Sequence, residues 1–166
     1  MTTDIEAILR EVGAMREGHF LLSSGRHADR YIEKFALLMR PRDTERVCRL
    51  IAGRFAGAGV ETVAGPTTGG ILLAFEVARQ LGVRAVYAER IEGGPGREFR
   101  RGATFRPGER VLLVDDILTT GGSVRDTLAA LVPHGVETAG VAVLVDRSGG
   151  RVDFGVPLYA TLQADI

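Results

Sequence analysis

One stretch decides the fold of this 166-residue chain: Val111-Leu112-Leu113-Val114-Asp115-Asp116-Ile117-Leu118-Thr119-Thr120-Gly121-Gly122-Ser123. Four consecutive apolar residues followed by two acids are typical of a strand buried on both faces of a parallel sheet. The acids then stand at the carboxyl end of that strand, where open α/β sheets bind ligands. Residues 119–123 form a Thr, Gly and Ser loop ahead of a predicted helix, and such a loop leaves backbone N–H groups free to bind an anion.

The acid pair and the loop are expected to bind opposite ends of one ligand. A phosphate in the loop is repelled by carboxylates, so Asp115 and Asp116 need a different partner. Vicinal sugar hydroxyls or a hydrated divalent cation would serve. A ribose 5-phosphate fits both parts of the stretch. A Walker-type P-loop is excluded, because Gly-Lys-Ser/Thr occurs nowhere in the sequence.

The composition is that of an ordinary globular protein, with 45% hydrophobic and 25% charged residues. The formal net charge of +0 gives no electrostatic reason to expect nucleic acid as a partner. No apolar stretch approaches the ~20 residues that span a bilayer, and the acidic start of the chain is unlike a signal peptide. Cys48 is the only cysteine, which excludes an intramolecular disulfide. We expect one domain over residues 1–166, in the cytoplasm, with no membrane partner.

Predicted strands and helices alternate along most of the chain, which indicates parallel βαβ units. We expect helices over residues 3–15, 41–57, 71–81 and 123–134, and strands over residues 62–65, 85–89, 110–114, 138–145 and 158–162. Residues 91–109 show no apolar period, and we expect a long structureless loop that acts as a lid. Residues 1–40 are expected to form a small hood over the sheet's carboxyl edge, and residues 41–166 the core.

A second glycine-rich loop, Gly65-Pro66-Thr67-Thr68-Gly69-Gly70, also leads from a strand into a helix. Glycines there let the backbone approach a diphosphate closely, although a tight βα turn would explain them equally. Arg147 follows Asp146 at the end of another predicted strand. It could pair with a substrate carboxylate, or lie on the surface beside a local acid.

The run 111–123 resembles the phosphoribosyl pyrophosphate (PRPP) signature of type I phosphoribosyltransferases at every position. Two further features, Leu22–Tyr31 and the Asp146-Arg147 pair, resemble the orotate phosphoribosyltransferases. This resemblance implies an α/β fold with a parallel sheet flanked by helices and a small N-terminal hood. It also implies a Mg²⁺-dependent homodimer that transfers the 5-phosphoribosyl group from PRPP to orotate, giving orotidine 5′-monophosphate and pyrophosphate in pyrimidine biosynthesis.

The resemblance also implies roles for individual residues. It assigns PRPP binding to Thr68, Gly69, Asp115, Asp116, Ile117, Leu118, Thr119, Thr120, Gly121, Gly122 and Ser123. It assigns base binding to Tyr31, Ile32, Thr119 and Arg147, and Mg²⁺ binding, through water, to Asp115 and Asp116. The residues expected to contribute to catalysis are Asp115, Asp116, Arg90, Arg97 and Arg100.

The predicted lid departs from the family pattern. Ile91 stands where the family has a Lys, and Gly94 and Gly96 replace a further Lys and a His. Arg97, Arg100 or Arg101 could substitute, although arginine is bulkier and does not give up its proton. Two alternatives therefore stay open. One is a transferase for a purine or another base, which would not require Arg147; the other is a PRPP-binding regulator without catalysis.

Overall fold

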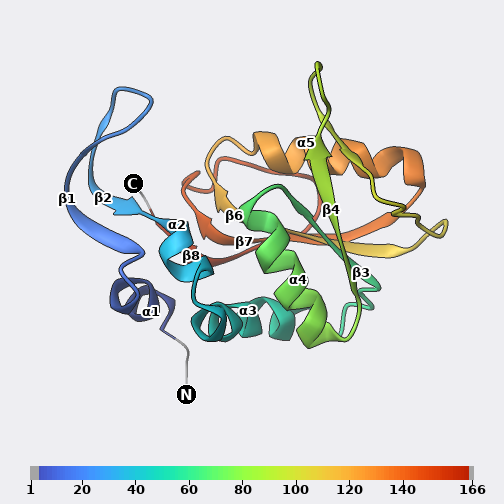
Figure 1. The fold of residues 1–166 in the computed structure, drawn as a ribbon, viewed down its shortest axis with the longest axis horizontal. Helices are drawn as coiled ribbons and strands as arrows, with labels where there is room; N and C mark the ends of the chain where they lie inside the picture. Colours follow the sequence, from blue (N-terminus) through green and yellow to red (C-terminus); the bar gives the residue numbers. More distant parts are fainter. Residues whose placement is uncertain (1–3, 165–166) are drawn as a thin grey trace.

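A six-stranded sheet in the order β5-β4-β3-β6-β7-β8 organises the computed structural model, which describes residues 4–164 (Figure 1). Its strands are β3 (Thr62–Pro66), β4 (Arg84–Arg90), β5 (Arg97–Phe99), β6 (Arg110–Leu118), β7 (Glu137–Asp146) and β8 (Leu158–Gln163). All neighbouring strands pair in parallel except β5, which is antiparallel to β4. The predicted parallel α/β fold is confirmed.

Helices cover both faces of this sheet. Helices α3 (Pro41–Phe55) and α4 (Gly69–Leu81) lie on one face, and α5 (Gly122–Leu131) lies on the other, followed by the 3₁₀ turn η1 (Val132–His134) (Figure 1). The apolar run of β6 accounts for this arrangement, because successive residues of a strand point to opposite faces. Leu112 and Val114 lie in the hydrophobic cluster of α3 and α4, whereas Leu113 packs with Val124 of α5. Burying one such side chain contributes about 1.5–3 kcal/mol.

The N-terminal region consists of α1 (Ile5–Glu11), an antiparallel hairpin of β1 (Met15–Leu21) and β2 (His27–Ile32), and α2 (Lys34–Leu38). Helix α1 is shorter than the expected helix over residues 3–15. The side chain of Asp4 accepts a hydrogen bond from the backbone N–H of Ala7 and caps its start, and Met15 already belongs to β1. The hairpin extends away from the sheet at the left of Figure 1.

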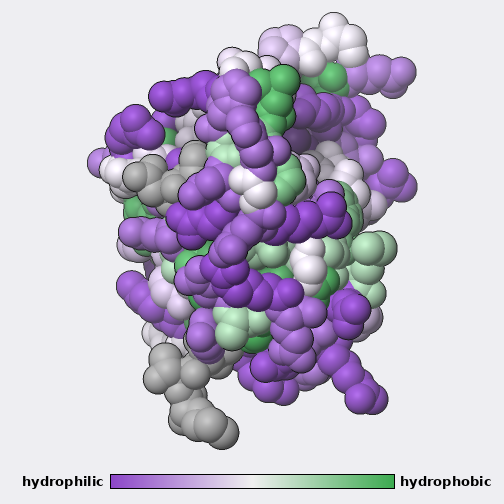
Figure 2. Space-filling view, turned by 90° about the vertical axis from the view of Figure 1, so that its left-hand side faces the viewer, coloured by the Kyte–Doolittle hydropathy of each residue, from purple (hydrophilic) through white to green (hydrophobic). Residues whose placement is uncertain are grey.

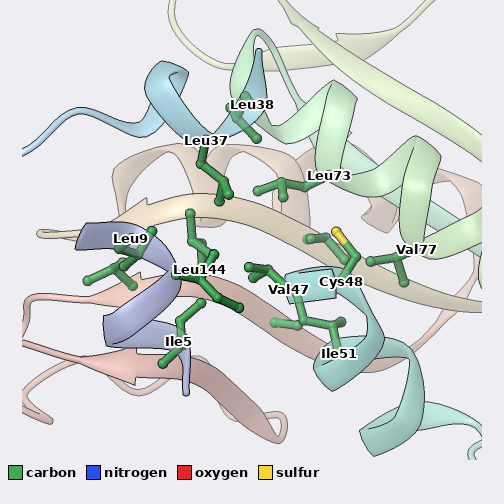
Figure 3. Close-up of a cluster of buried hydrophobic side chains, with 14 of the residues drawn as sticks. Ile5, Leu9, Leu37, Leu38, Val47, Cys48, Ile51, Leu73, Val77 and Leu144 are labelled. Carbon is green, nitrogen blue, oxygen red and sulfur yellow. The ribbon is translucent and has the colours of Figure 1, made fainter. Parts of the chain in front are cut away.

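The N-terminal helices share one hydrophobic core with the sheet. Leu9 of α1 and Leu37 of α2 lie in the same cluster as Ile51 of α3, Leu73 of α4 and Leu144 of β7 (Figure 3). All five side chains are fully buried. Helix α2 is therefore held in a fixed position relative to the sheet, and the β1–β2 hairpin projects from this core.

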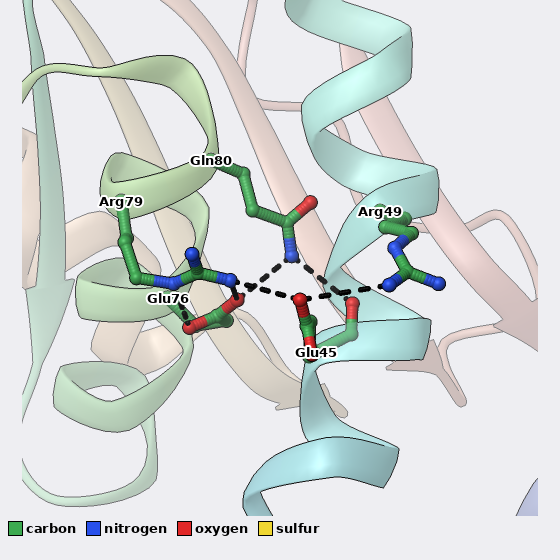
Figure 4. Close-up of polar contacts among 5 residues, drawn as sticks. All are labelled: Glu45, Arg49, Glu76, Arg79 and Gln80. Carbon is green, nitrogen blue, oxygen red and sulfur yellow. Dashed lines mark hydrogen bonds and ion pairs between the residues drawn. The ribbon is translucent and has the colours of Figure 1, made fainter.

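Polar side chains join α3 to α4 at the surface (Figure 4). Nη2 of Arg79 lies 2.7 Å from Oε1 of Glu76 and 3.0 Å from Oε1 of Glu45. The side-chain amide of Gln80 donates to the backbone carbonyl of Glu45 at 3.0 Å. Such exposed pairs contribute about 0–1 kcal/mol each, so the buried face of the two helices supplies most of their stability.

The expectation of a structureless loop over residues 91–109 is wrong. Residues 97–99 form β5, which pairs with residues 88–90 of β4. Phe99 packs edge-on against Phe105 and His134, with ring centroids 5.2 and 5.9 Å away. A strand of three residues is too short to show an apolar period, which explains why the pattern concealed it.

The face of the molecule on the side of the N-terminal hairpin is mainly polar. Figure 2, which faces the side of the N-terminal hairpin, shows mostly hydrophilic residues with hydrophobic ones in small separate patches. Within residues 4–164, none of the helices combines the length and the hydropathy needed to cross a bilayer.

Candidate active site

Two neighbouring acids near the carboxyl end of β6 have different surroundings. Oδ2 of Asp115 accepts a hydrogen bond from the hydroxyl of Ser123, at the start of α5, at 2.7 Å. Oδ2 of Asp116 lies 2.7 Å from Nζ of Lys34, at the start of α2. Because α5 and α2 belong to opposite sides of the sheet, the strand directs one carboxylate toward each side. Both residues are buried, at 5% and 6% exposure.

Burial, and after it the negative charge of Asp116, raise the pKa of the Asp115 carboxyl to about 6. The hydrogen bond from Ser123 acts in the opposite direction, because it stabilises the carboxylate form. Asp115 thus changes charge close to neutral pH. Perturbed carboxyl groups of this kind are common where a protein binds a cation or a developing positive charge.

The loop 119–123 has the geometry expected of an anion site. Gly121, the residue before α5, has a φ of 87°, a conformation that glycine adopts at no steric cost. The first N–H groups of a helix have no partners within the helix, and the helix dipole favours negative charge there. The backbone N–H groups of residues 119–123 donate to no other group in the part of the chain that the structure describes. They are free to bind a phosphate.

The second glycine-rich loop lies directly against Asp116. A Cβ atom at Gly69 would stand 2.1 Å from Oδ2 of Asp116, so no larger residue fits there without a shift. Thr67, in the same loop, accepts a hydrogen bond at its hydroxyl from Nη1 of Arg97 at 2.8 Å. The two loops therefore flank the acid pair, one on each side of β6.

A cavity of about 780 Å³ opens beside the loop 119–123. Its lining combines the tip of the β1–β2 hairpin with the loops after β6 and β7: Leu21, Leu22, Ser23, Ser24, Arg26, Tyr31, Thr119, Thr120, Arg147, Ser148, Arg151 and Val152. Three of these residues are arginines and none is acidic. The cavity is therefore suited to an anionic ligand.

Arg147 has no acidic partner in this cavity. None of the ion pairs formed within residues 4–164 includes it, and its Nε is buried without a hydrogen-bond partner. The adjacent Asp146 instead accepts a hydrogen bond from the backbone N–H of Ser148 at 2.7 Å. The interpretation that Arg147 pairs with a local acid is thus wrong. The hydroxyl oxygen of Ser148 is likewise buried and unpartnered, which suits a polar ligand between the two residues.

The structure brings some predicted residues together and separates others. Tyr31, Thr119 and Arg147 line the same cavity. Ile32 does not reach it, because this side chain is 4% exposed and packs in the main core. In a β-strand neighbouring residues face opposite ways, so Tyr31 and Ile32 do not share one surface.

The lid arginines also differ from one another. Arg97 is buried, and its Nη1 donates to the carbonyl of Ala88 as well as to Thr67. It fixes the glycine-rich loop rather than moving with a lid. Arg90 and Arg100 are exposed on the β4–β5 hairpin, where Nη2 of Arg100 donates to the carbonyl of Arg90 at 3.2 Å. This hairpin projects beyond the sheet in Figure 1.

Sequence analysis missed three charged residues of this region. Lys34 reaches Asp116, and Arg26 and Arg151 line the cavity. The rarity of lysine was a signal for the first, since Lys34 is the only lysine in the chain. Nothing in the local pattern distinguishes Arg26 or Arg151 from the other arginines.

Comparison with known proteins defines the class. Residues 41–154 match the phosphoribosyl transferase domain, so the chain is a member of that superfamily. It is 50% identical over 167 aligned positions to orotate phosphoribosyltransferase from Pelotomaculum thermopropionicum, an alignment that covers 100% of this chain and 87% of the relative. The chain belongs to the orotate phosphoribosyltransferase family.

Solved structures agree with this assignment. The crystal structure of orotate phosphoribosyltransferase from Aeropyrum pernix matches with a TM-score of 0.79 and 29% identity, over 96% of this chain and 93% of that one. Adenine phosphoribosyltransferase from Thermoanaerobacter pseudethanolicus matches with a TM-score of 0.74 at 18% identity, over 94% of this chain and 99% of that one. The second likeness shows the shared fold alone.

Proposed function

We propose that this protein transfers the 5-phosphoribosyl group of PRPP to orotate, producing orotidine 5′-monophosphate and pyrophosphate. The relatives' names support this reaction, and one observation in the structure carries the choice of base. The unpaired Arg147 guanidinium lies in an acid-free cavity beside the phosphate loop. A guanidinium binds a carboxylate such as that of orotate through two parallel hydrogen bonds. A purine base offers no carboxylate to it.

The acid pair fits Mg²⁺ bound together with the substrate. No group of three or more His, Cys, Asp or Glu side chains within residues 4–164 could hold a metal by itself. Mg²⁺ commonly binds through one or two carboxylates, with water and substrate phosphates completing its coordination. Asp115 and Asp116 would hold it in this manner, directly or through water. Bound there, Mg²⁺ would neutralise charge on the departing diphosphate.

The protein groups around this site match the charges that the reaction develops. Cleavage of the bond between C1′ and the diphosphate oxygen leaves positive charge on the sugar, which the carboxylates stabilise. The free N–H groups of 119–123 would hold the 5′-phosphate, and the loop with Thr68 and Gly69 would bind the diphosphate. Orienting both substrates while stabilising these charges supplies the catalysis, and no covalent nucleophile is required.

We further propose a cytoplasmic homodimer in which the exposed Arg90 and Arg100 of one subunit approach the diphosphate in the partner's site. Their exposed place on the projecting β4–β5 hairpin supports this role. Sedimentation of the pure protein tests the dimer. A monomer that turns over orotate at full rate would contradict it.

An assay of the pure protein with PRPP, Mg²⁺ and a panel of orotate, uracil, adenine, hypoxanthine and guanine tests the reaction. We expect transfer to orotate only, and an Arg147→Ala variant with an orotate KM at least about tenfold higher and an unchanged KM for PRPP. Transfer to a purine would favour the first alternative. PRPP binding without transfer to any base would favour a regulator.

A further inference from the structure

The only lysine of the chain contacts the acid pair from outside the PRPP signature. Nζ of Lys34 lies 2.7 Å from Oδ2 of Asp116, whose side chain is 9% exposed, whereas the Lys34 side chain is 34% exposed. The lysine thus extends from the surface of α2 to an acid in the interior. Other ion pairs, such as Arg10–Glu6 and Arg49–Glu45, join two exposed side chains at the surface and point to no ligand.

The position of α2 makes this contact a fixed feature of the fold. Leu37 and Leu38 of the same helix are buried in the main core, and α2 contacts α4. A Cβ atom at Gly69 would lie 3.3 Å from Cδ1 of Leu38, so α2 runs directly past the second glycine-rich loop. Lys34 therefore stands beside that loop because the helix that carries it is anchored there.

The loop itself has no positive charge. Residues 65–70 are Gly, Pro, Thr, Thr, Gly and Gly, so no side chain of the loop carries a charge. Here the space next to Gly69 is taken by Oδ2 of Asp116, the oxygen that Lys34 contacts. A diphosphate carries several negative charges, which backbone N–H groups alone neutralise poorly. Arg97 contacts this loop through the hydroxyl of Thr67, and the ammonium group of Lys34 is a second cation that approaches it from α2.

We propose that Lys34 is a PRPP-binding residue that brings a second positive charge, beside that of Arg97, to the glycine-rich loop. In the free protein its ammonium group is paired with Asp116. When PRPP and Mg²⁺ bind, Asp116 turns to the metal and the sugar hydroxyls, and Lys34 contacts the diphosphate oxygens. This assignment rests on the proposed function, since it deepens the account of how the same site binds PRPP.

The test is titration calorimetry of the full-length protein with inorganic diphosphate, with and without Mg²⁺. Three variants are compared with the unaltered chain: Lys34→Gln, which removes the charge at similar size, Lys34→Arg, which keeps it, and Arg42→Gln. Arg42 is an exposed cation of α3 that does not line the cavity, and its replacement makes the same change in net charge. We expect Lys34→Gln to weaken diphosphate binding by at least about tenfold, Lys34→Arg to restore most of it, and Arg42→Gln to change nothing.

Steady-state kinetics separates binding at this site from a general loss of structure. Lys34→Gln should raise the KM for PRPP and leave the KM for orotate within about twofold. Unchanged diphosphate affinity in Lys34→Gln would overturn the proposal. So would an equal loss of orotate and diphosphate binding together with a lowered Tm, because Lys34 would then act only on the fold.

The same measurements distinguish this proposal from the proposed reaction. Suppose that the unaltered protein transfers nothing to orotate, but that Lys34→Gln binds diphosphate more weakly than the unaltered protein does. The reaction is then refuted and the role of Lys34 stands. If orotate is turned over normally by Lys34→Gln at low PRPP concentration, the reaction stands and the role of Lys34 is refuted.

Discussion

The hydroxyl of Ser123 donates a hydrogen bond to Oδ2 of Asp115 at 2.7 Å, and so links the phosphate loop to the acid pair. This bond counteracts the burial that raises the pKa of Asp115 to about 6. We therefore expect phosphate binding at the loop 119–123 and the charge of Asp115 to be coupled through the Ser123 side chain. A ligand that reorients Ser123 changes the environment of Asp115 as well.

The first prediction concerns the pH dependence of PRPP use. The carboxylate form of Asp115 is the form that binds a cation, so kcat/KM for PRPP should fall as the pH drops through about 6. Ser123→Ala removes a hydrogen bond that favours the carboxylate, which raises the pKa and moves this fall to higher pH. Ser123→Thr keeps a hydroxyl and should preserve the profile. A profile of Ser123→Ala that coincides with that of the unaltered protein would disprove the coupling.

A second prediction follows for stability. The pKa of Asp115 is raised by folding, so the carboxyl group favours the folded state below its unfolded pKa of about 3.9 and loses this contribution as the pH rises through about 6. At pH 7.5 the buried charge therefore destabilises the fold. Asp115→Asn should raise the free energy of unfolding there by on the order of 1–3 kcal/mol while abolishing transfer. Urea denaturation at pH 7.5 and pH 4 measures this, and the gain should vanish at the lower pH.

If Asp115→Asn is stabilised and also keeps its activity, Asp115 has no role in the reaction. A variant that is less stable at both pH values would instead show that the carboxylate makes contacts which outweigh its burial.

Residues 111–123 allowed the fold to be predicted because their signals are local. The apolar residues 111–114, the acids and the glycines are neighbours in sequence, and strand burial, helix start and anion loop each depend on only a few adjacent residues. The position of Arg147 also follows from a local signal, because the residue stands at the end of its strand and there lines the cavity. Its lack of an acidic partner, however, depends on residues far away in the chain.

The features that the sequence concealed are contacts between distant segments. Lys34 and Asp116 lie far apart in the sequence, and they meet because α2 packs beside α4. Arg97 was expected in a mobile lid because its surroundings are rich in glycine. Its side chain is buried because β5 pairs with β4, and no local sequence pattern predicts that pairing. Ile32 was assigned to the base, but strand alternation turns it into the core.

The third prediction tests the position of Arg97 under the glycine-rich loop. Arg97→Met keeps the length of the side chain but removes its hydrogen bonds to Thr67 and Ala88. The loop should then lose its support, and we expect the KM for PRPP to rise by at least about tenfold with little change in the KM for orotate. Thr67→Val removes only the first of these bonds and should give a smaller effect in the same direction.

Arg100→Gln serves as the contrast, because Arg100 is exposed and contacts Glu98 rather than the loop. If it acts on the leaving diphosphate, it should lower kcat more than it raises the KM for PRPP. Equal effects of Arg97→Met and Arg100→Gln on both constants would argue against separate roles.

The last prediction uses the close contact between Gly69 and Asp116. In Gly69→Ala the added Cβ would lie 2.1 Å from Oδ2 of Asp116, so either the loop or the acid must move. We expect PRPP binding to weaken by at least about a hundredfold, since both partners belong to the same site. Gly53→Ala is the matched control: Gly53 lies within α3 with nothing near its added Cβ, and the change should stabilise the protein by about 0.5–1 kcal/mol. Calorimetry with PRPP and thermal unfolding of both variants distinguish the two effects, and a Gly69→Ala variant that binds PRPP normally would show that the loop and the acid can separate without loss of the site.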